Sequence, residues 1–343
     1  MTQVTADQPV RPPREWPGVS VVMPVLNEER HLADAVGRVL DQHYPGPLEV
    51  IMAVGPSRDR TGEIAAQLAA RDHRLRVLDN PAGKTPVALN LAIAASRYDI
   101  LVRVDGHGEL GDDYIARAVE LLEETGAANV GGVMDAQGRT PFEQAVAYIY
   151  TSRFGLGGSA FHQGDVPAGP AETVFLGVFN KPDLIAVGGF DESMHRAQDW
   201  ELNFRLRGSG RLVYFSPELR VTYRPRSTLV ALTRQMYDTG KWRREVVRRH
   251  SGTASARYLA PPAAVVAIAG GTVAAWLGHR VGSRLLRLGA LAPLGYVAFV
   301  GYVTLSAPSS LSPAARCRLP LALAATHVAW GTGFLVGRRR RTV

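Results

Sequence analysis

Asp105 and His107 are the side chains in this sequence whose types and spacing best suit a metal site. They follow the apolar run 99–104, and residues two apart on an extended strand end face the same side. Carboxylate and imidazole together suit Mn²⁺ or Mg²⁺, and imidazole favours Mn²⁺. With further ligands from a diphosphate, such an ion would neutralise charge on a leaving nucleoside diphosphate. An Asp-Gly pair after a strand is also a common turn, so the motif in isolation leaves a structural role open.

A second acidic position, Asp199, stands in the segment QDWELN at 198–203, near the expected start of a helix. A carboxylate there could take a proton from an incoming hydroxyl group as a general base. It could equally cap the helix by accepting backbone N–H groups, which is a common role for Asp at that place. Asp191, in the segment GGFDE at 188–192, is expected to be a structural turn residue.

Two further segments carry polar groups that could meet a phosphorylated ligand. The turn PVLNE at 24–28 precedes a helix, whose N-terminal amides can face an anion. In NPAGKTPVALN at 80–90, Lys84 opens a helix and could contact phosphate or simply be solvated. Asn90 lies within an apolar helix face, where a buried amide needs hydrogen-bond partners.

Strands and helices alternate along the first part of the chain with short loops. This alternation predicts an α/β fold with a mostly parallel, Rossmann-like sheet and flanking helices. Ligands bind such sheets beyond the carboxyl ends of the strands, which is where Asp105 stands. Strands are expected at 19–25, 48–54, 75–78, 99–104 and 129–135, and helices at 27–40, 61–70, 84–96, 112–124 and early in 141–165.

The composition divides the chain into a soluble part and an apolar tail. Hydrophobic residues make up 46% of the 343 residues, and the last third contains long runs without Asp or Glu. The formal net charge is +8, and basic clusters at 241–249 and 338–341 adjoin the apolar runs. Clusters in this position indicate anionic lipid and membrane orientation rather than nucleic acid. The single cysteine, Cys317, excludes an internal disulfide.

Three apolar segments, 259–279, 285–306 and 318–337, approach the roughly 20 residues that a bilayer span needs. A hairpin of the second and third, with the first lying in the interface, would keep the basic tail on the cytoplasmic side. The predicted organisation is a disordered leader without a signal peptide at 1–17, a catalytic domain at 18–228, an amphipathic interface region at 229–258, membrane-associated segments at 259–337 and a basic tail at 338–343.

Within the interface region, the segment RQMYDTGKWR at 234–243 carries two residues that could serve a substrate. Gln235 and Trp242 could close over a diphosphate or stack on a sugar. Trp242 could instead anchor the membrane interface, as aromatic residues beside arginines often do.

Taken in order, these motifs resemble those of family 2 glycosyltransferases, and within them the bacterial exopolysaccharide enzymes of the succinoglycan-biosynthesis type. The resemblance covers about 19–250 and implies a GT-A fold and an inverting displacement. Asp105 and His107 stand where the family has its D-x-D, and Asp199 stands at the base position, with Gln198 in place of the preceding Glu. The segments that carry the resemblance are PVLNEE, AVGPSRDRT, NPAGKTPVALN, VRVDGH, GGFDE, QDWELNFRLR and RQMYDTGKWR.

The resemblance also implies the substrates and the residues that bind them. The donor would be a nucleotide sugar, expected to be a UDP-sugar, although the segment VGPS at 54–57 lacks the Asp that bonds uracil in many relatives. The residues implied for the donor are Pro24, Asn27, Glu28, Ser57, Asp59, Lys84, Asn90, Arg103, Asp105, Gln235 and Trp242, and those implied for the acceptor are Gly157, Gly158, Gln198 and Trp200.

The acceptor is expected to be a polyprenyl-diphosphate-linked saccharide, used in exopolysaccharide or cell-envelope glycan synthesis. Because nucleotide sugars are made in the cytoplasm, the catalytic domain should lie on the cytoplasmic side of the cell membrane. The basic residues just before the apolar tail agree with that orientation.

Other functions remain open at the level of sequence. A nucleotidyltransferase also uses a Rossmann-like half and acidic metal ligands, but it needs neither a base at Asp199 nor a membrane anchor. A membrane-tethered protein that binds nucleotides or sugars without catalysis would explain the missing Asp near Gly55. A processive synthase would carry more spans and a Q-x-x-R-W motif, which Gln235 and Trp242 only approximate.

Overall fold

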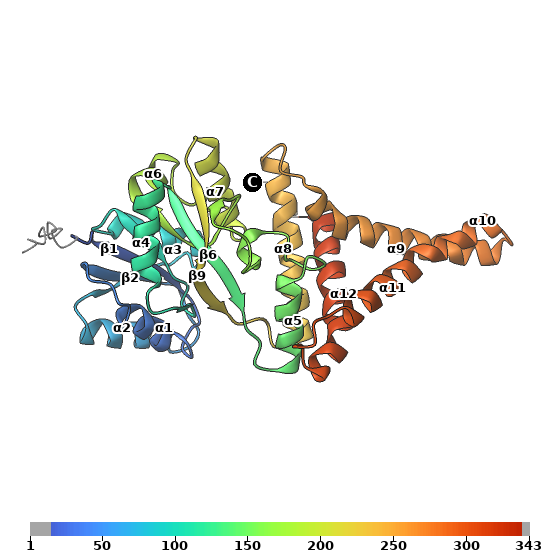
Figure 1. The fold of residues 1–343 in the computed structure, drawn as a ribbon, viewed down its shortest axis with the longest axis horizontal. Coiled ribbons are helices and arrows are strands. Elements are labelled where there is room, and N and C mark those ends of the chain that lie inside the picture. The colour runs from blue at the N-terminus through green and yellow to red at the C-terminus, as the bar shows by residue number, and fades with distance from the viewer. Residues whose placement is uncertain (1–14, 338–343) are drawn as a thin grey trace, which may run out of the picture.

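The computed structural model describes residues 15–337 and contains a mixed sheet with helices on both faces (Figure 1). Four strands form its parallel half in the order β3-β2-β1-β4. Continuous apolar runs suit strands that are covered on both faces of a sheet. The four predicted strands are confirmed to within one residue at their ends. They are β1 (Val19–Val25), β2 (Leu48–Val54), β3 (Leu75–Asp79) and β4 (Ile100–Arg103).

The other half of the sheet mixes strand directions. β8 (Phe175–Asn180) lies antiparallel between β4 and β6 (Asn129–Ala136), whereas β6 runs parallel to β9 (Val213–Tyr223). The pairing of β6 with β9 shifts at Gly132, where a Cβ atom would overlap the backbone of Leu219. The mostly parallel sheet is confirmed, but the antiparallel β8 was not predicted. Two short strands, β5 (Glu109–Leu110) and β7 (Gly169–Pro170), pair with β9.

Apolar cores cover both faces of the sheet. α1 (Leu32–Leu40) and α4 (Tyr114–Thr125) bury their apolar faces in one core, to which the partly buried α2 (Thr61–Arg71) adds. α3 (Thr85–Ala95), α6 (Lys181–Ala186) and α7 (Gln198–Gly208) pack into the core on the other face.

The sequence pattern predicted that the first helix begins at Asn27, but it begins at Leu32. Asn27 has a positive φ of 57°, which is not helical. The backbone N–H groups of Asn27, Glu28 and Glu29 donate to side chains of the loop after β2, so they are not part of a helix.

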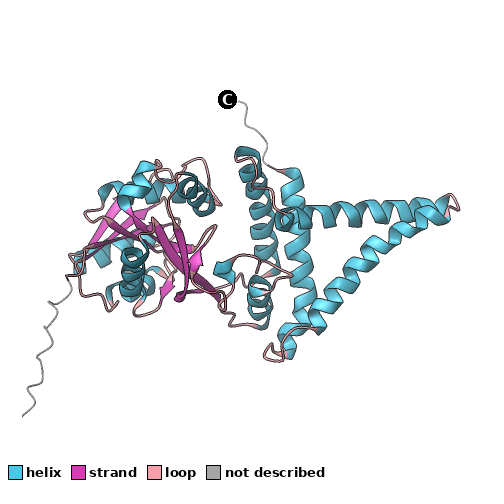
Figure 2. Ribbon diagram, turned by 45° about the horizontal axis from the view of Figure 1, so that its top comes forward, coloured by secondary structure: helices cyan, strands magenta, loops and turns pink. Residues whose placement is uncertain are grey.

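Three helices form a layer beside the sheet domain, and a helical hairpin projects from that layer (Figures 1 and 2). In the layer, α12 (Pro313–Val336) lies against α5 (Pro141–Thr151) and α8 (Leu229–Arg249). The three predicted apolar segments are confirmed as long apolar helices. The hairpin runs out along α9 (Ala256–Arg280) and returns through α10 (Arg284–Arg287), the 3₁₀ turn Leu288–Ala290 and α11 (Leu291–Leu305).

Trp16 packs edge-on against Tyr44, with ring centroids 5.4 Å apart. The end of the segment expected to be a leader is therefore docked on the sheet domain. The remainder of that prediction, at 1–14, and the basic tail at 338–343 lie outside the described residues.

Candidate active site

Asp105 and Asp199 meet at one buried arginine. Arg103 ends β4, and its side chain is 5% exposed. Its guanidinium donates to Asp105 Oδ1 at 3.0 and 3.2 Å and also pairs with Asp199 Oδ1. The predicted metal ligand and the predicted base, nearly a hundred residues apart in the sequence, therefore lie together at the carboxyl end of β4.

Asp199 lies in the first turn of α7 and does not cap it. The capping position is occupied by Ala197, which has a φ of 59°. Farther along the helix, buried Asn203 accepts from Asn129 Nδ2 at 2.7 Å and donates to Thr173 Oγ1 at 2.8 Å. Because buried amides are costly to leave unpaired, these bonds hold α7 in place on the sheet. The helix-capping role that the sequence had left open is thereby excluded for Asp199.

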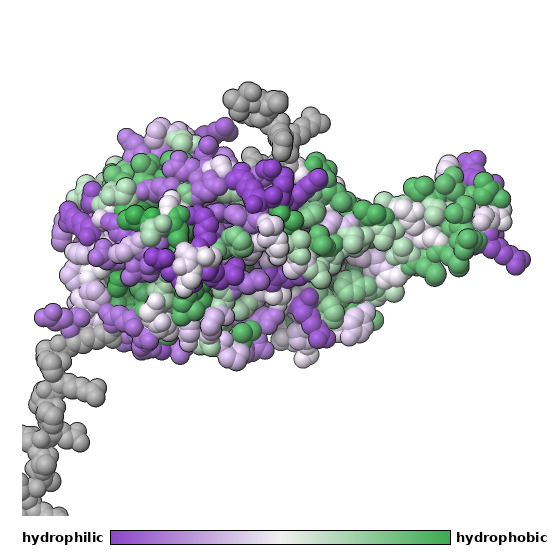
Figure 3. Space-filling view, turned by 90° about the horizontal axis from the view of Figure 1, so that it is seen from above, coloured by the Kyte–Doolittle hydropathy of each residue, from purple (hydrophilic) through white to green (hydrophobic). Residues whose placement is uncertain are grey.

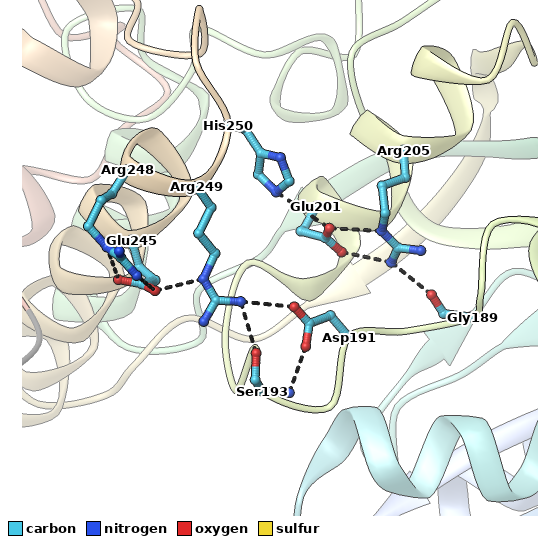
Figure 4. Close-up of polar contacts among 9 residues, drawn as sticks. All are labelled: Gly189, Asp191, Ser193, Glu201, Arg205, Glu245, Arg248, Arg249 and His250. Atoms are coloured by element: carbon cyan, nitrogen blue, oxygen red, sulfur yellow. Dashed lines mark hydrogen bonds and ion pairs between the residues drawn. The ribbon is translucent and has the colours of Figure 1, made fainter. Parts of the chain in front are cut away.

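Ion pairs also join α7 and the preceding loop to α8 (Figure 4). Asp191 pairs with Arg249 at 2.9 Å, in agreement with the structural role expected for it. Glu201, whose side chain is 4% exposed, pairs with Arg205 at 2.7 Å. The helix that carries Asp199 is thus held by the sheet, and the loop before it is tied to α8. The same network contains bonds from Arg205 to Gly189 O, from Arg249 to Ser193 and Glu245, and from Arg248 to Glu245, and an approach of His250 to Glu201.

The Asp199 carboxyl has a pKa above its ordinary value. Burial is the largest cause and repulsion by the Asp105 carboxylate adds to it, while the Arg103 guanidinium acts in the opposite direction. Burial also lowers the pKa of Arg103, but the two carboxylates outweigh it and the net shift is upward. The Asp199 side chain is still 41% exposed, so a substrate hydroxyl can reach it. A carboxylate that is more basic than usual and open on one side suits general-base catalysis.

His107 is oriented by Glu28, which follows β1. Its Nδ1 atom lies 2.8 Å from Glu28 Oε1, and this hydrogen bond is the main cause that raises the pKa of His107. Gly106 permits the approach, because a Cβ atom there would lie 2.9 Å from Glu28 Cγ. A carboxylate that holds one imidazole nitrogen leaves the other to ligate a metal, which is the usual arrangement around metal-bound histidine.

Asp105 and His107 therefore fit a divalent ion that takes its remaining ligands from a diphosphate. Oxygen and imidazole ligands in this combination suit Mn²⁺ or Mg²⁺. Within residues 15–337, no three His, Cys, Asp or Glu side chains gather into a site that could hold an ion by themselves.

Three residues predicted to contact the donor hold two loops together. Asn27 Oδ1 accepts from the backbone of Arg58 at 2.8 Å, and its N–H donates to Ser57 Oγ at 3.0 Å. Asp59 accepts from the Glu29 backbone at 3.2 Å. These bonds tie the loop after β1 to the loop after β2, so the side chains shape the loops rather than stand free for a ligand. Sequence reasoning missed this role because the bonded residues lie about thirty positions apart.

Asn90 has a structural role, and its contact with the donor stays a prediction. Its Nδ2 donates to Phe190 O at 2.9 Å and to Glu192 Oε1 at 3.1 Å, and its Oδ1 accepts from Phe190 N at 2.9 Å. The partners that an amide in this position needs thus come from the loop that leads to α7.

Gln235 contacts an arginine that the sequence did not single out. Its Nε2 donates to the Tyr223 hydroxyl at 3.0 Å, and its Oε1 accepts from Arg226 at 3.3 Å. Arg226 and His107 line the same groove. Arg226 follows β9 in an irregular segment without a recognisable motif, so only the fold reveals it.

The remaining predicted donor residues differ in accessibility. Pro24 pairs with Ala53 in the register of β1 and β2, at the carboxyl end of the sheet. Lys84 is the N-cap residue of α3 and is half-buried. Trp242 is only 8% exposed and packs beside His195, with ring centroids 5.6 Å apart, so the predicted stacking on a sugar does not fit this conformation.

Two of the residues predicted to bind the acceptor lie on α7 and two in the loop after α5, and three of the four are buried. Trp200 is 7% exposed and stacks on Phe204 at 5.5 Å, with the Arg243 guanidinium 4.9 Å from its ring. Gln198 is also buried. Of the two loop glycines, Gly157 is buried and bonded through its carbonyl to Gln163, whereas Gly158 is exposed and its carbonyl accepts from Arg257.

A groove of about 770 Å³ adjoins His107 on the side of α1 and the segment after β9. Several arginines line it, so its chemistry suits a phosphate-bearing ligand. The lining includes Glu28, Arg30, Arg38, His107, Arg139 and Arg226.

Comparison with known proteins places this arrangement in context. Residues 20–169 match the sequence profile described as Glycosyl transferase family 2. Over 331 residues the chain is 33% identical to the succinoglycan biosynthesis protein ExoA of Rhizobium meliloti (strain 1021), covering 94% of this chain and 96% of that protein. It is 23% identical over 243 residues to a dolichyl N-acetyl-alpha-D-glucosaminyl phosphate 3-beta-D-2,3-diacetamido-2,3-dideoxy-beta-D-glucuronosyltransferase of Methanococcus voltae, covering 67% of this chain and 74% of the relative.

Among solved structures, the fold is similar to that of the mannosyltransferase PcManGT from Pyrobaculum calidifontis, in complex with GDP-Man and Mn²⁺. The TM-score is 0.57 and the sequence identity 16%, with 95% of this chain and 90% of that chain covered. At this identity the likeness concerns the fold, and it agrees with the predicted GT-A architecture.

Proposed function

This chain belongs to glycosyltransferase family 2, among the enzymes of exopolysaccharide synthesis, and from that premise we propose the reaction that it catalyses. The donor is a nucleotide sugar, with a UDP-sugar as the expected choice. The acceptor is a polyprenyl-diphosphate-linked saccharide at the cytoplasmic face of the cell membrane. The transfer inverts the anomeric centre in one displacement and requires Mn²⁺ or Mg²⁺.

The observation that carries this proposal is the contact of Arg103 with both Asp105 and Asp199. In the proposed step, the acceptor hydroxyl oxygen forms a bond to the anomeric carbon and gives its proton to the Asp199 carboxylate. The bond from that carbon to the diphosphate oxygen breaks, and the nucleoside diphosphate leaves with the electron pair. Arg103 orients Asp199, and its predicted contact with the donor is retained as part of the proposal.

Asp105 and His107 would hold the divalent ion. When bound, the ion would neutralise the charge that develops on the leaving diphosphate. The similar mannosyltransferase, which was solved with GDP-Man and Mn²⁺, supports a metal-dependent reaction. The diphosphate of the donor would supply further oxygens to the ion.

The function is tested by incubating the purified protein with a panel of nucleotide sugars in the presence of Mn²⁺ or Mg²⁺. Release of a nucleoside diphosphate from one nucleotide sugar, dependent on the metal, is expected. Release of inorganic diphosphate from a nucleoside triphosphate would instead identify a nucleotidyltransferase, and binding without turnover of any donor or acceptor would identify a non-catalytic binding protein.

Glu28→Ala is expected to weaken Mn²⁺ binding in the presence of UDP by about 10–100-fold, the usual cost of removing a carboxylate behind a metal-bound histidine. The reason is that Glu28 fixes the His107 ring through its Nδ1 atom. Calorimetric titration with Mn²⁺ measures the change. Glu29→Ala is the matched control, because the neighbouring Glu29 carboxylate accepts from the Arg60 backbone instead. Equal Mn²⁺ affinity in the two variants would contradict the positioning role.

A further inference from the structure

The third apolar helix, α12, contacts the sheet domain or its attached helices near both of its ends. At its N-terminal end, Ser312 Oγ donates to Gln144 Oε1 of α5 at 2.7 Å. Near its C-terminal end, Arg244 of α8 donates to Phe334 O at 3.2 Å. A helix of 24 residues is roughly 36 Å long, about the thickness of a bilayer. Contacts at both ends therefore keep α12 alongside the sheet domain over its whole length.

The contact between α12 and α8 is close, because glycines face the partner helix at several points. A Cβ atom at Gly240 would overlap the backbone of Trp330, and one at Gly333 would overlap the backbone of Tyr237. Small residues let two helix backbones approach in this way. The buried face of α12 is formed by Ala315, Leu319, Ala322, Leu323, Thr326, Ala329, Trp330, Gly331 and Gly333.

The partner of α12 cannot itself lie in hydrocarbon. α8 carries charged residues along its length, including Asp238, Lys241 and Glu245. Ionised side chains within a bilayer core are costly and rare. Since α12 lies along this charged helix, it also lies outside the hydrocarbon core, and its exposed apolar residues such as Leu321 and Val328 form one surface beside the membrane.

The other two apolar helices are mostly exposed rather than packed against charged helices. Only 11% of the most apolar window is buried in α9 and in the returning segment 284–305, against 44% in α12. At about 1.5 Å per residue, their 25 and 22 residues extend roughly 37 and 33 Å, enough to cross a bilayer. In Figures 1 and 2 both lead away from the layer of α5, α8 and α12, and α12 runs across the direction of α9.

The projecting hairpin has an apolar shaft and a basic tip. In Figure 3 hydrophobic residues predominate along the shaft and hydrophilic ones appear at its end. The tip carries Arg280, Arg284 and Arg287, and the Arg280 guanidinium lies 5.2 Å from the Trp276 ring centroid. Arginine beside tryptophan suits the headgroup region of a membrane, whereas three arginines at mid-bilayer would be costly.

We propose that α9 and the segment 284–305 cross the bilayer as a hairpin, with the tip at 281–283 on the side opposite to the sheet domain. In this topology α12 lies along the membrane surface, where it packs between the hairpin and the helices α5 and α8. This replaces the hairpin of 285–306 and 318–337 expected from sequence, because the connecting loop of that hairpin is fixed to α5 through Ser312. The topology does not depend on the donor, the acceptor or the metal.

Two crossings return the chain to the side of the sheet domain before α12 begins. The basic residues of α8 lie on that side. This distribution agrees with the positive-inside rule for a cytoplasmic sheet domain, and the three arginines at the tip form the smaller basic group on the other side.

Single-cysteine labelling tests the topology in the full-length protein. In a Cys317→Ser background, which removes the only native cysteine, single cysteines are introduced at four exposed positions. They are Val281→Cys at the hairpin tip, Ser310→Cys in the loop before α12, Val336→Cys at the C-terminal end of α12 and Ala66→Cys on the sheet domain. Because these side chains are exposed, the variants should fold. A membrane-impermeant maleimide is applied to intact cells and then to permeabilised cells. Ser283→Cys, partly exposed in the same tip, is a second tip position should Val281→Cys be poorly expressed.

The expected result is that Val281→Cys reacts on one side of the membrane and that Ser310→Cys, Val336→Cys and Ala66→Cys react only on the other. Reaction of Val336→Cys on the side opposite to Ala66→Cys would show that α12 crosses the membrane and would overturn the proposal. Reaction of Ser310→Cys on that opposite side would support the hairpin of 285–306 and 318–337 and would also overturn the proposal. Reaction of both tip positions on the same side as Ala66→Cys would show that the hairpin does not cross, and would overturn it equally.

Discussion

Replacement of Asp199 by asparagine is expected to lower kcat by about 10²–10⁴-fold, the range that a general base contributes. Asparagine keeps an oxygen that can accept from Arg103, so α7 and the paired guanidinium should remain in place. It cannot accept a proton from the acceptor hydroxyl. Donor affinity should therefore change little while turnover falls, a combination that separates loss of the base from loss of the fold. Turnover is measured as nucleoside diphosphate release with acceptor, and donor affinity by calorimetry.

Asp191→Asn is the matched control for this experiment. It makes the same chemical change eight positions away, at a carboxylate that pairs with Arg249 on the outside of the site. Turnover near the wild-type value is expected for it. If Asp199→Asn retained similar turnover to Asp191→Asn, the proton would be accepted elsewhere and the base assignment would be wrong.

The same carboxylate predicts the pH dependence of the reaction. A general base acts in its ionised form, so kcat falls as pH decreases through its pKa. Burial is the main cause that raises the pKa of Asp199, and it acts also when a metal ion neutralises the Asp105 charge. The acid limb of kcat, measured at saturating Mn²⁺ and donor, should therefore lie above the ordinary Asp value of about 3.9. A kcat that stays constant down to that value would contradict the assignment.

Asp105→Ala is expected to abolish the increase in donor affinity that Mn²⁺ provides. Asp105 supplies one of only two protein ligands in the proposed site, so the loss should exceed the roughly 10–100-fold that removal of a supporting residue costs. Donor binding is measured by equilibrium dialysis with Mn²⁺ and with a chelator. The wild type should differ between the two conditions, and the variant should bind equally weakly in both.

Asp113→Ala controls for the loss of a nearby negative charge. The Asp113 side chain is 78% exposed and pairs with His43, away from the ligands. It should preserve the Mn²⁺ dependence. Identical donor affinity of the wild-type protein with and without Mn²⁺ would remove the metal from the proposed mechanism altogether.

The local sequence pattern was sufficient to predict many of the strands and helices of the sheet domain. The apolar runs of β1, β2 and β4 identified buried strands, because a strand that is covered on both faces of a sheet has apolar residues at successive positions. This pattern can be recognised without knowing which distant residues cover the strand. The alternation with helices then placed Asp105 at a carboxyl strand end, where ligands bind. The antiparallel β8 escaped prediction, since strand direction depends on pairing partners far away in the chain.

The arrangement of the active site could not be predicted from local sequence pattern. The sequence by itself determined which side chains were available: two candidate metal ligands, a carboxylate near the start of a helix, and three apolar helices of spanning length. Only the tertiary structure decided that Arg103 joins Asp105 to Asp199, and that Asn27, Asp59 and Asn90 form hydrogen bonds between loops. It also decided that α12 packs on α8. Each of these outcomes depends on hydrogen bonds or close packing between residues far apart in the chain, and short-range periodicity carries no information about which distant groups will meet.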